Sequence, residues 1–262
     1  MLGVAAGIAV LTLLMSPIPQ PASYHNFADQ RSWLGLTNFW NVISNLPFAI
    51  VGVWGIVFIL RSGGVNQKQP FVDPRERWPY LAIFAGLVLT AFGSAYYHLA
   101  PNNAHLVWDR LPMTIVFGSM VAALIAERIS VNAGLALLPW LIAFSAASVL
   151  EWYWTELRGQ GDLRIYAAVQ IYSALALLMA LLLPAKYTRG RDFAVVFAFY
   201  VLAKLFETFD RAIYSAGHVV SGHTLKHLAA AAAGYWILRM LRLREPLARN
   251  SSAINTRALS SY

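Results

Sequence analysis

Residues 79–99 read PYLAIFAGLVLTAFGSAYYHL, a run without any Asp, Glu, Lys or Arg that ends on a histidine and a leucine. An apolar stretch of about 20 residues is long enough to cross a membrane as an α-helix. Further stretches of the same kind lie at 36–60, 105–126, 134–153, 164–184, 193–210 and 217–241. The sequence therefore predicts an all-α, polytopic membrane bundle of seven transmembrane helices.

The composition agrees with a membrane bundle. Of the 262 residues, 58% are hydrophobic and only 12% are charged, about half the charged fraction of an average soluble domain. The mean hydropathy is +0.55. The chain contains no cysteine, which excludes a disulfide, a thiolate metal ligand and a cysteine nucleophile. Any metal chemistry must therefore use histidine and carboxylate side chains.

The chain divides by composition into three parts. Residues 1–22 begin with a short apolar run and end in a proline-rich turn, so they are either a signal segment or an additional N-terminal hydrophobic helix. Residues 23–241 hold the predicted spans, with no linker long enough to separate a second domain. Residues 242–262 are polar and lack apolar periodicity, which predicts a disordered cytoplasmic tail.

Lysine and arginine are distributed unequally between the two ends of the predicted bundle. Thirteen of the 20 lie at the end that holds the C-terminal tail, and the other end has Arg31, Arg110, Arg158, Arg164 and Arg211. Cytoplasmic loops carry the basic excess in membrane proteins, so we expect the C-terminus to be cytoplasmic. The formal net charge of +8 then reflects topology, and we expect no nucleic-acid partner.

Ionisable side chains gather near the opposite, non-cytoplasmic end of the spans. His98 ends one predicted span, Asp109 lies near the start of the next, and His223 and His227 lie near the start of the last. Ionisable groups at membrane depth are costly, which makes them candidates for a functional site. Residues four apart share a helix face, so His223 and His227 point the same way. We expect the three imidazoles to converge.

Three neutral histidines with an open fourth position are typical of a catalytic zinc site, where the metal lowers the pKa of its water to about 7. Asp109 is the candidate general base, or alternatively a fourth ligand that would make the site structural. Ser94, one turn from His98, is placed to donate a hydrogen bond to a substrate carbonyl. The alternative is that the histidines pair with Ser or Thr, hold a haem or face a polar cavity.

Other ionisable residues have structural interpretations. Lys204 and Glu207 are three apart and are expected to pair. Lys226 is expected to face away from the histidine pair and either to snorkel toward the membrane surface or to pair with an acid on 193–210. Asp210 is a candidate to reach a histidine ring near the site and to orient it by a hydrogen bond. We expect the remaining histidines to lie outside the site: His25, His105 and His218.

Three blocks of the sequence resemble the alkaline ceramidase family. They are Phe39-Trp-Asn-Val-Ile-Ser-Asn45, then Gly93-Ser-Ala-Tyr-Tyr-His98 with Trp108-Asp-Arg-Leu-Pro-Met113, and finally His223-Thr-Leu-Lys-His227. The resemblance spans about residues 29–241. Ceramidases belong to a wider superfamily of seven-helix proteins that includes the adiponectin and progestin receptors and enzymes that remodel the lipids of GPI anchors.

The resemblance implies a zinc-dependent intramembrane hydrolase of sphingolipid metabolism. Its substrate would be ceramide or a related N-acyl lipid, cleaved at the amide bond to a fatty acid and a free amine. By the resemblance, Asp109 activates the metal-bound water and Ser94 assists at the carbonyl. The zinc ligands would be His98, His223 and His227.

Eukaryotic ceramidases also hold calcium through an acidic segment ahead of the first span. Calcium takes six to eight oxygen ligands, and residues 24–29 keep a single carboxylate, Asp29. A complete calcium site is therefore not expected, and Asp29 and Asn38 are at most its remnants.

Two other function classes stay open at the level of sequence. One is a seven-helix lipid sensor or receptor without turnover, which the short termini disfavour. The other is an ion transporter that uses the buried His and Asp as a relay, which the lack of an internal repeat disfavours.

Overall fold

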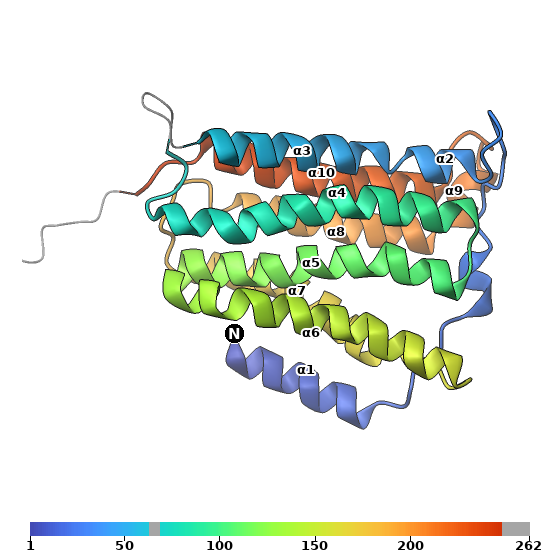
Figure 1. The fold of residues 1–262 in the computed structure, drawn as a ribbon, viewed down its shortest axis with the longest axis horizontal. Helices are drawn as coiled ribbons and strands as arrows, with labels where there is room; N and C mark the ends of the chain where they lie inside the picture. Colours follow the sequence, from blue (N-terminus) through green and yellow to red (C-terminus); the bar gives the residue numbers. More distant parts are fainter. Residues whose placement is uncertain (63–68, 248–262) are drawn as a thin grey trace, which may run out of the picture.

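The computed structural model describes residues 1–62 and 69–247. Within these residues the regular structure is helical, with isolated bridges but no strand. Figure 1 shows the long helices running side by side along one direction. The predicted all-α class is confirmed.

Most of the helices follow one another with short connections, and the longest connections lie between α1 and α2 and between α3 and α4. The α-helices are α1 Leu2–Leu14, α2 Phe39–Ile43, α3 Leu46–Arg61, α4 Arg77–Leu99, α5 Asn103–Arg128, α6 Val131–Leu157, α7 Arg164–Leu182, α8 Asp192–Thr208, α9 Asp210–Ser215 and α10 Gly222–Leu243. Two short 3₁₀ turns lie at Ala22–His25 and Pro74–Glu76. Each predicted span therefore falls on a helix, except the span 36–60, which is divided between α2 and α3.

Five segments among the described residues are long and apolar enough to cross a membrane: Phe39–Arg61, Pro74–Leu99, Asn103–Arg128, Val131–Leu157 and Arg164–Leu182. The predicted count of seven is not confirmed. The helix α8 has only 17 residues, and α10 carries His, Lys and Arg side chains along its length. The short length of α8 and the charged side chains of α10 explain why these two helices are not among the segments long and apolar enough to cross a membrane.

Side-chain caps fix where several helices begin. The side chains of Asn102, Ser130 and Ser221 accept hydrogen bonds from backbone N–H groups in the first turns of α5, α6 and α10. Such caps satisfy N–H groups that have no partner within the helix. The caps of α5 and α10 set the start of the two helices that carry Asp109 and the His223–His227 pair.

The helices α4 and α5 approach each other closely at Gly93. A β-carbon at this position would collide with the backbone carbonyl of Trp108. Gly93 and Trp108 immediately precede Ser94 and Asp109 in the sequence. The close approach therefore places these two polar side chains at the same level of the bundle.

The helix α1 lies at the edge of the bundle, where it contacts α7 (Figure 1). Asp162 and Arg164, which flank the start of α7, connect it to the rest of the molecule. The Asp162 carboxylate accepts a hydrogen bond from the Ile18 N–H at 3.4 Å, and the Arg164 guanidinium donates to the Thr12 carbonyl at 3.3 Å. These contacts hold the N-terminal segment against the loop between α6 and α7.

The described part of the C-terminal segment is folded at the other end of the bundle. Arg244 is buried and donates to the Pro70 carbonyl at 2.9 Å and to Glu127 at 2.6 Å. Its guanidinium also lies 4.0 Å from the centre of the Tyr187 ring. The tail predicted to be disordered continues beyond Leu247, and that stretch, 248–262, lies outside the described residues.

Candidate metal centre

The three predicted histidines converge at one end of the bundle. One ligand nitrogen from each of His98, His223 and His227 lies within 4.8 Å of the others. The ring centres are 4.9 to 5.0 Å apart. All three side chains are buried, with His98 fully enclosed. The last turn of α4 supplies one ring and the first turns of α10 supply the other two.

The start of α10 is fixed by Asp210, which opens α9. One oxygen of its carboxylate accepts a hydrogen bond from the His223 backbone N–H at 2.8 Å. The other accepts from the Ala28 N–H at 2.9 Å. Asp210 therefore reaches the site through backbone groups, and not through a histidine ring as the sequence suggested. It ties the N-terminal loop to the helix that carries two of the histidines.

The ring of His227 is oriented by Ser44, which lies between α2 and α3. The Ser44 Oγ is 2.7 Å from His227 Nδ1 and donates its proton to the Asn41 carbonyl at 3.1 Å. Because a hydroxyl has a single proton, Nδ1 must donate to Ser44. The other nitrogen, Nε2, then keeps its lone pair. Fixing a ligand ring through its second nitrogen is typical of metal-binding histidines.

Several buried ring nitrogens of the group have no hydrogen-bond partner in the described part of the chain. Both nitrogens of His98 and Nε2 of His223 have no hydrogen-bond partner among the described residues. Buried polar atoms are normally paired, and a group of orphaned imidazole nitrogens fits a metal ion. Phe27 covers the group, with its ring centre 4.7 Å from that of His98 and 4.6 Å from that of His223. The donor set therefore fits zinc.

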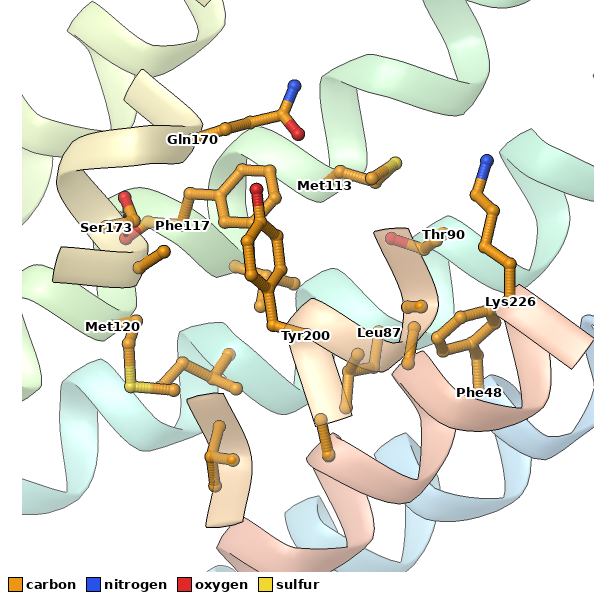
Figure 2. A pocket seen from close by; sticks show the side chains of 18 of the residues that line it. Phe48, Leu87, Thr90, Met113, Phe117, Met120, Gln170, Ser173, Tyr200 and Lys226 are labelled. Carbon is orange, nitrogen blue, oxygen red and sulfur yellow. Dashed lines mark hydrogen bonds between the residues drawn. The ribbon is translucent and has the colours of Figure 1, made fainter. Parts of the chain in front are cut away.

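An apolar cavity of about 160 Å³ opens beside the centre. Ser94, Asp109 and His227 line its polar end, together with Lys226. Figure 2 shows Lys226 and Thr90 on one side of this space and Met120 at its far side. The Asp109 carboxylate is not among the ligand atoms that lie within 4.8 Å of one another. It lines the same cavity as His227, and no contact among the described residues makes it a fourth ligand.

A partly buried ion cluster adjoins this polar end. Glu207 on α8 accepts from Lys226 at 2.6 Å and from Lys204 at 2.9 Å, as the spacing predicted. It also accepts from the Tyr24 hydroxyl at 3.1 Å. Lys226 was expected to face away from the histidines, but its side chain lines the same cavity as His227.

The other histidines lie outside the group of three. His25 bonds to Tyr97 and Asn103, and His105 to Tyr96. His218 is exposed and adopts a left-handed backbone conformation.

The two residues considered as calcium remnants have other partners. The Asp29 carboxylate is bound by the Arg31 guanidinium through two nitrogens, at 2.9 and 2.6 Å. The Asn38 side chain donates to the His98 carbonyl at 2.9 Å. The Arg31 guanidinium therefore already binds the Asp29 carboxylate oxygens that a calcium ion would need.

Comparison with known families decides where this architecture belongs. Residues 9–233, more than four fifths of the chain, match the family described as the dsRNA-gated channel SID-1. The chain belongs to the SID-1 dsRNA-gated channel family. Membership and the apolar helices together make it an integral, multi-pass membrane protein. No curated protein matches the chain.

Membership in the SID-1 family corrects the function implied by the ceramidase resemblance. That resemblance rests on short blocks around polar residues, whereas the family match extends over nearly all the helices. The assignments to a ceramidase, to a zinc amidohydrolase and to sphingolipid metabolism are therefore wrong, and a lipid-sensing receptor is not supported. The expected partners, a lipid substrate and no nucleic acid, are wrong in the same way, because the family is named for dsRNA.

Proposed function

We propose that this protein is a zinc-binding membrane protein of the channel class. Double-stranded RNA either gates it or passes through it across the membrane. The match of residues 9–233 to the dsRNA-gated channel family carries the proposal. A net charge of +8 supports it, because the affinity of proteins for nucleic acids comes mainly from neutralised phosphates. The excess of Lys and Arg would then bind the phosphates of RNA in addition to setting the orientation of the protein in the membrane.

In this proposal the histidines hold zinc and the metal joins elements that are far apart in the sequence. His98 would hold it from α4, and His223 and His227 from α10. When bound, zinc supplies a fixed positive charge and a cross-link between the two helices. Ser44 keeps the His227 ring in the tautomer that leaves Nε2 free, and Phe27 excludes water from the rings.

Asp109 and Ser94 serve the same centre from the rim of the cavity. Both are buried, and the close packing of α4 on α5 holds them at one level. A carboxylate beside a zinc site can accept hydrogen bonds from groups on the metal and orient them. We assign Asp109 that positioning role and give Ser94 the role of its hydrogen-bonding neighbour.

We propose seven membrane spans, with α8 and α10 as the sixth and seventh. These two helices pack against each other, and α10 also packs against α3. Charge on α10 is tolerated because its buried ionisable groups face partners inside the bundle. The unequal distribution of Lys and Arg supports a cytoplasmic C-terminus, with the histidine centre toward the other side of the membrane.

A duplex cannot pass through the centre of a single copy in this conformation. The core between the helices is filled by fully buried side chains such as Ile83, Phe193 and Leu238. Passage of RNA therefore requires that the helices separate or that several copies surround a path. In either case the RNA contacts the protein first through its phosphates at an end of the bundle.

Reconstitution into liposomes tests the proposal. Purified protein is inserted into vesicles, and ion flux is measured while double-stranded RNA, single-stranded RNA or double-stranded DNA is added. We expect flux that rises with double-stranded RNA and falls as salt is increased. Empty vesicles and vesicles with His227→Ala protein serve as controls. Equal flux with all three nucleic acids, or none with any, would contradict the proposal.

A further inference from the structure

Arg110 is a buried positive charge without a carboxylate partner. It lies on α5 directly after Asp109 and is only 5% exposed. Among the described residues it forms no ion pair, and its one side-chain acceptor is Gln20 Oε1 at 2.6 Å. Its other terminal nitrogen has no hydrogen-bond partner. A buried charge is costly unless it is paired, so this arrangement calls for a counter-charge.

Aromatic rings enclose the guanidinium but cannot accept its hydrogen bonds in full. Its carbon lies 4.2 Å from the ring centre of Trp152, 5.0 Å from that of Tyr166 and 5.5 Å from that of Tyr24. Cation–π contacts offset part of the cost of burial. They leave the unpaired N–H groups of Arg110 without an acceptor.

Two more donors on the residues that contact Arg110 also lack acceptors. Gln20 Nε2 and Trp152 Nε1 are buried and have no partner among the described residues. Gln20 is 8% exposed and Trp152 is fully buried. Gln20 and Trp152 each contact Arg110, and all three residues carry N–H groups that no acceptor among the described residues satisfies. Buried donors are paired in the great majority of cases, so a missing acceptor is indicated.

None of the nearby acids among the described residues forms an ion pair with Arg110. Glu207 is bound by Lys226, Lys204 and Tyr24, and Asp162 is bound by Arg164. Asp109 lines the cavity beside the histidine centre. Asp109, the preceding residue, attracts the Arg110 guanidinium electrostatically, but none of these carboxylates forms an ion pair with it.

We propose that Arg110, Gln20 and Trp152 bind a small monovalent anion of the halide class. One unpaired guanidinium calls for one negative charge, and the burial of all three residues leaves no access for a bulky anion. N–H donors without competing acceptors suit a halide. The anion would connect the N-terminal segment, through Gln20, to α5 and α6. This site is separate from the zinc centre and does not depend on the RNA partner.

Thermal unfolding of the detergent-purified full chain tests the site. The protein is compared in sodium chloride, sodium bromide and sodium gluconate at equal ionic strength. We expect chloride and bromide to raise the unfolding temperature in a saturable way and gluconate, which is too large, to have no such effect. The variant Trp152→Phe keeps a ring but removes the N–H, and it should raise the half-effective chloride concentration about tenfold.

Arg110→Met should abolish the difference between chloride and gluconate. The matched control is Arg158→Met, because Arg158 is an exposed arginine that stacks 3.6 Å from the ring centre of Trp154. The control should keep the full response to chloride. A wild type that responds equally to chloride and gluconate, or an Arg110→Met variant that keeps the response, would overturn the proposal and leave water as the missing acceptor. If Arg110→Met does not fold, unchanged responses in both Trp152→Phe and Gln20→Ala would overturn it instead.

Discussion

The Ser44 hydroxyl is the side chain that should tune the metal centre without holding the metal. It receives the Nδ1 proton of His227 and so leaves Nε2 available. Removing such a partner typically weakens metal binding about 10–100-fold. We expect Ser44→Ala to bind zinc with an affinity reduced by that factor, measured by competition with a chelator. Ser62→Ala, whose hydroxyl donates to the Phe58 carbonyl far from the centre, is the matched control. Equal affinities in the two variants would contradict the assigned tautomer.

At this scale the sequence predicts the ligands but not their partners. His223 and His227 are one turn apart, and His98 ends a span at the same depth, so their convergence follows from helix geometry. Ser44 and Phe27 come from other parts of the chain, and only the packing of the helices brings them to the rings. Ser44 lies in the Phe39–Asn45 block that resembles a known family, but nothing in the sequence indicated that its hydroxyl would bond to His227.

The acid sensitivity of the N-terminal contact depends on Asp162. Its burial raises the pKa of the carboxyl group, but hydrogen bonds from Arg164 and from the Ile18 N–H outweigh this, and the pKa lies below its usual value. A lowered pKa means that the carboxylate stabilises the fold above the unfolded-state pKa of about 3.9, and this stability is lost as pH falls through the folded-state pKa. Asp162→Asn should therefore lower the unfolding temperature at pH 7, and the difference from wild type should disappear as pH approaches that range. A difference that stays constant with pH would contradict this.

Among the elements, the contact between α4 and α5 is the most sensitive to a small substitution. A methyl group at Gly93 collides with the Trp108 carbonyl, which belongs to backbone and cannot turn away. Overpacking of this kind typically costs about 1–3 kcal/mol. We expect Gly93→Ala to unfold at a lower temperature than wild type.

The control for this substitution is Gly7→Ala in α1. Nothing lies within 4 Å of a β-carbon at Gly7, and alanine is the better helix former. Gly7→Ala should match or exceed the wild-type unfolding temperature. If Gly93→Ala behaves in the same way, the close approach of α4 and α5 is wrong.

Helix positions follow from the sequence more closely than their ends do. The predicted span 36–60 is broken in the structure between α2 and α3. Ser44 and Asn45 lie at the break, and their side chains bond to the carbonyls of Asn41 and Val42. Such local hydrogen bonds compete with the helix. Hydropathy averages over these residues and therefore cannot locate the break, although the break is what places Ser44 beside His227.

At the scale of the whole molecule, the proposed topology can be tested because the chain has no cysteine. Gln160 is exposed between α6 and α7, and Asn132 is exposed at the opposite end of α6. Single substitutions Gln160→Cys and Asn132→Cys are labelled with a membrane-impermeant maleimide on intact cells. We expect Gln160→Cys to react at once and Asn132→Cys to react only after the membrane is permeabilised. The reverse pattern of labelling would show that the proposed orientation in the membrane is wrong.

The short motifs of the sequence did not predict that the chain belongs to the SID-1 family. A buried set of His, Asp and Ser residues can serve more than one function on a helical frame, so local blocks are a weak guide to activity. The match over residues 9–233 draws on the whole pattern of helices and loops. The ion cluster of Glu127, Tyr80 and Arg244 was also not foreseen, because its members are far apart in the sequence and meet only in the folded bundle.

The metal content of the detergent-purified protein tests the zinc centre most directly. Wild type is measured by mass spectrometry beside His227→Ala, and His218→Asn serves as the control because His218 is exposed and asparagine tolerates its left-handed backbone. We expect about one zinc per chain in wild type and in the control, and none in His227→Ala. Folded wild-type protein that holds no zinc and takes up none on titration would contradict the account.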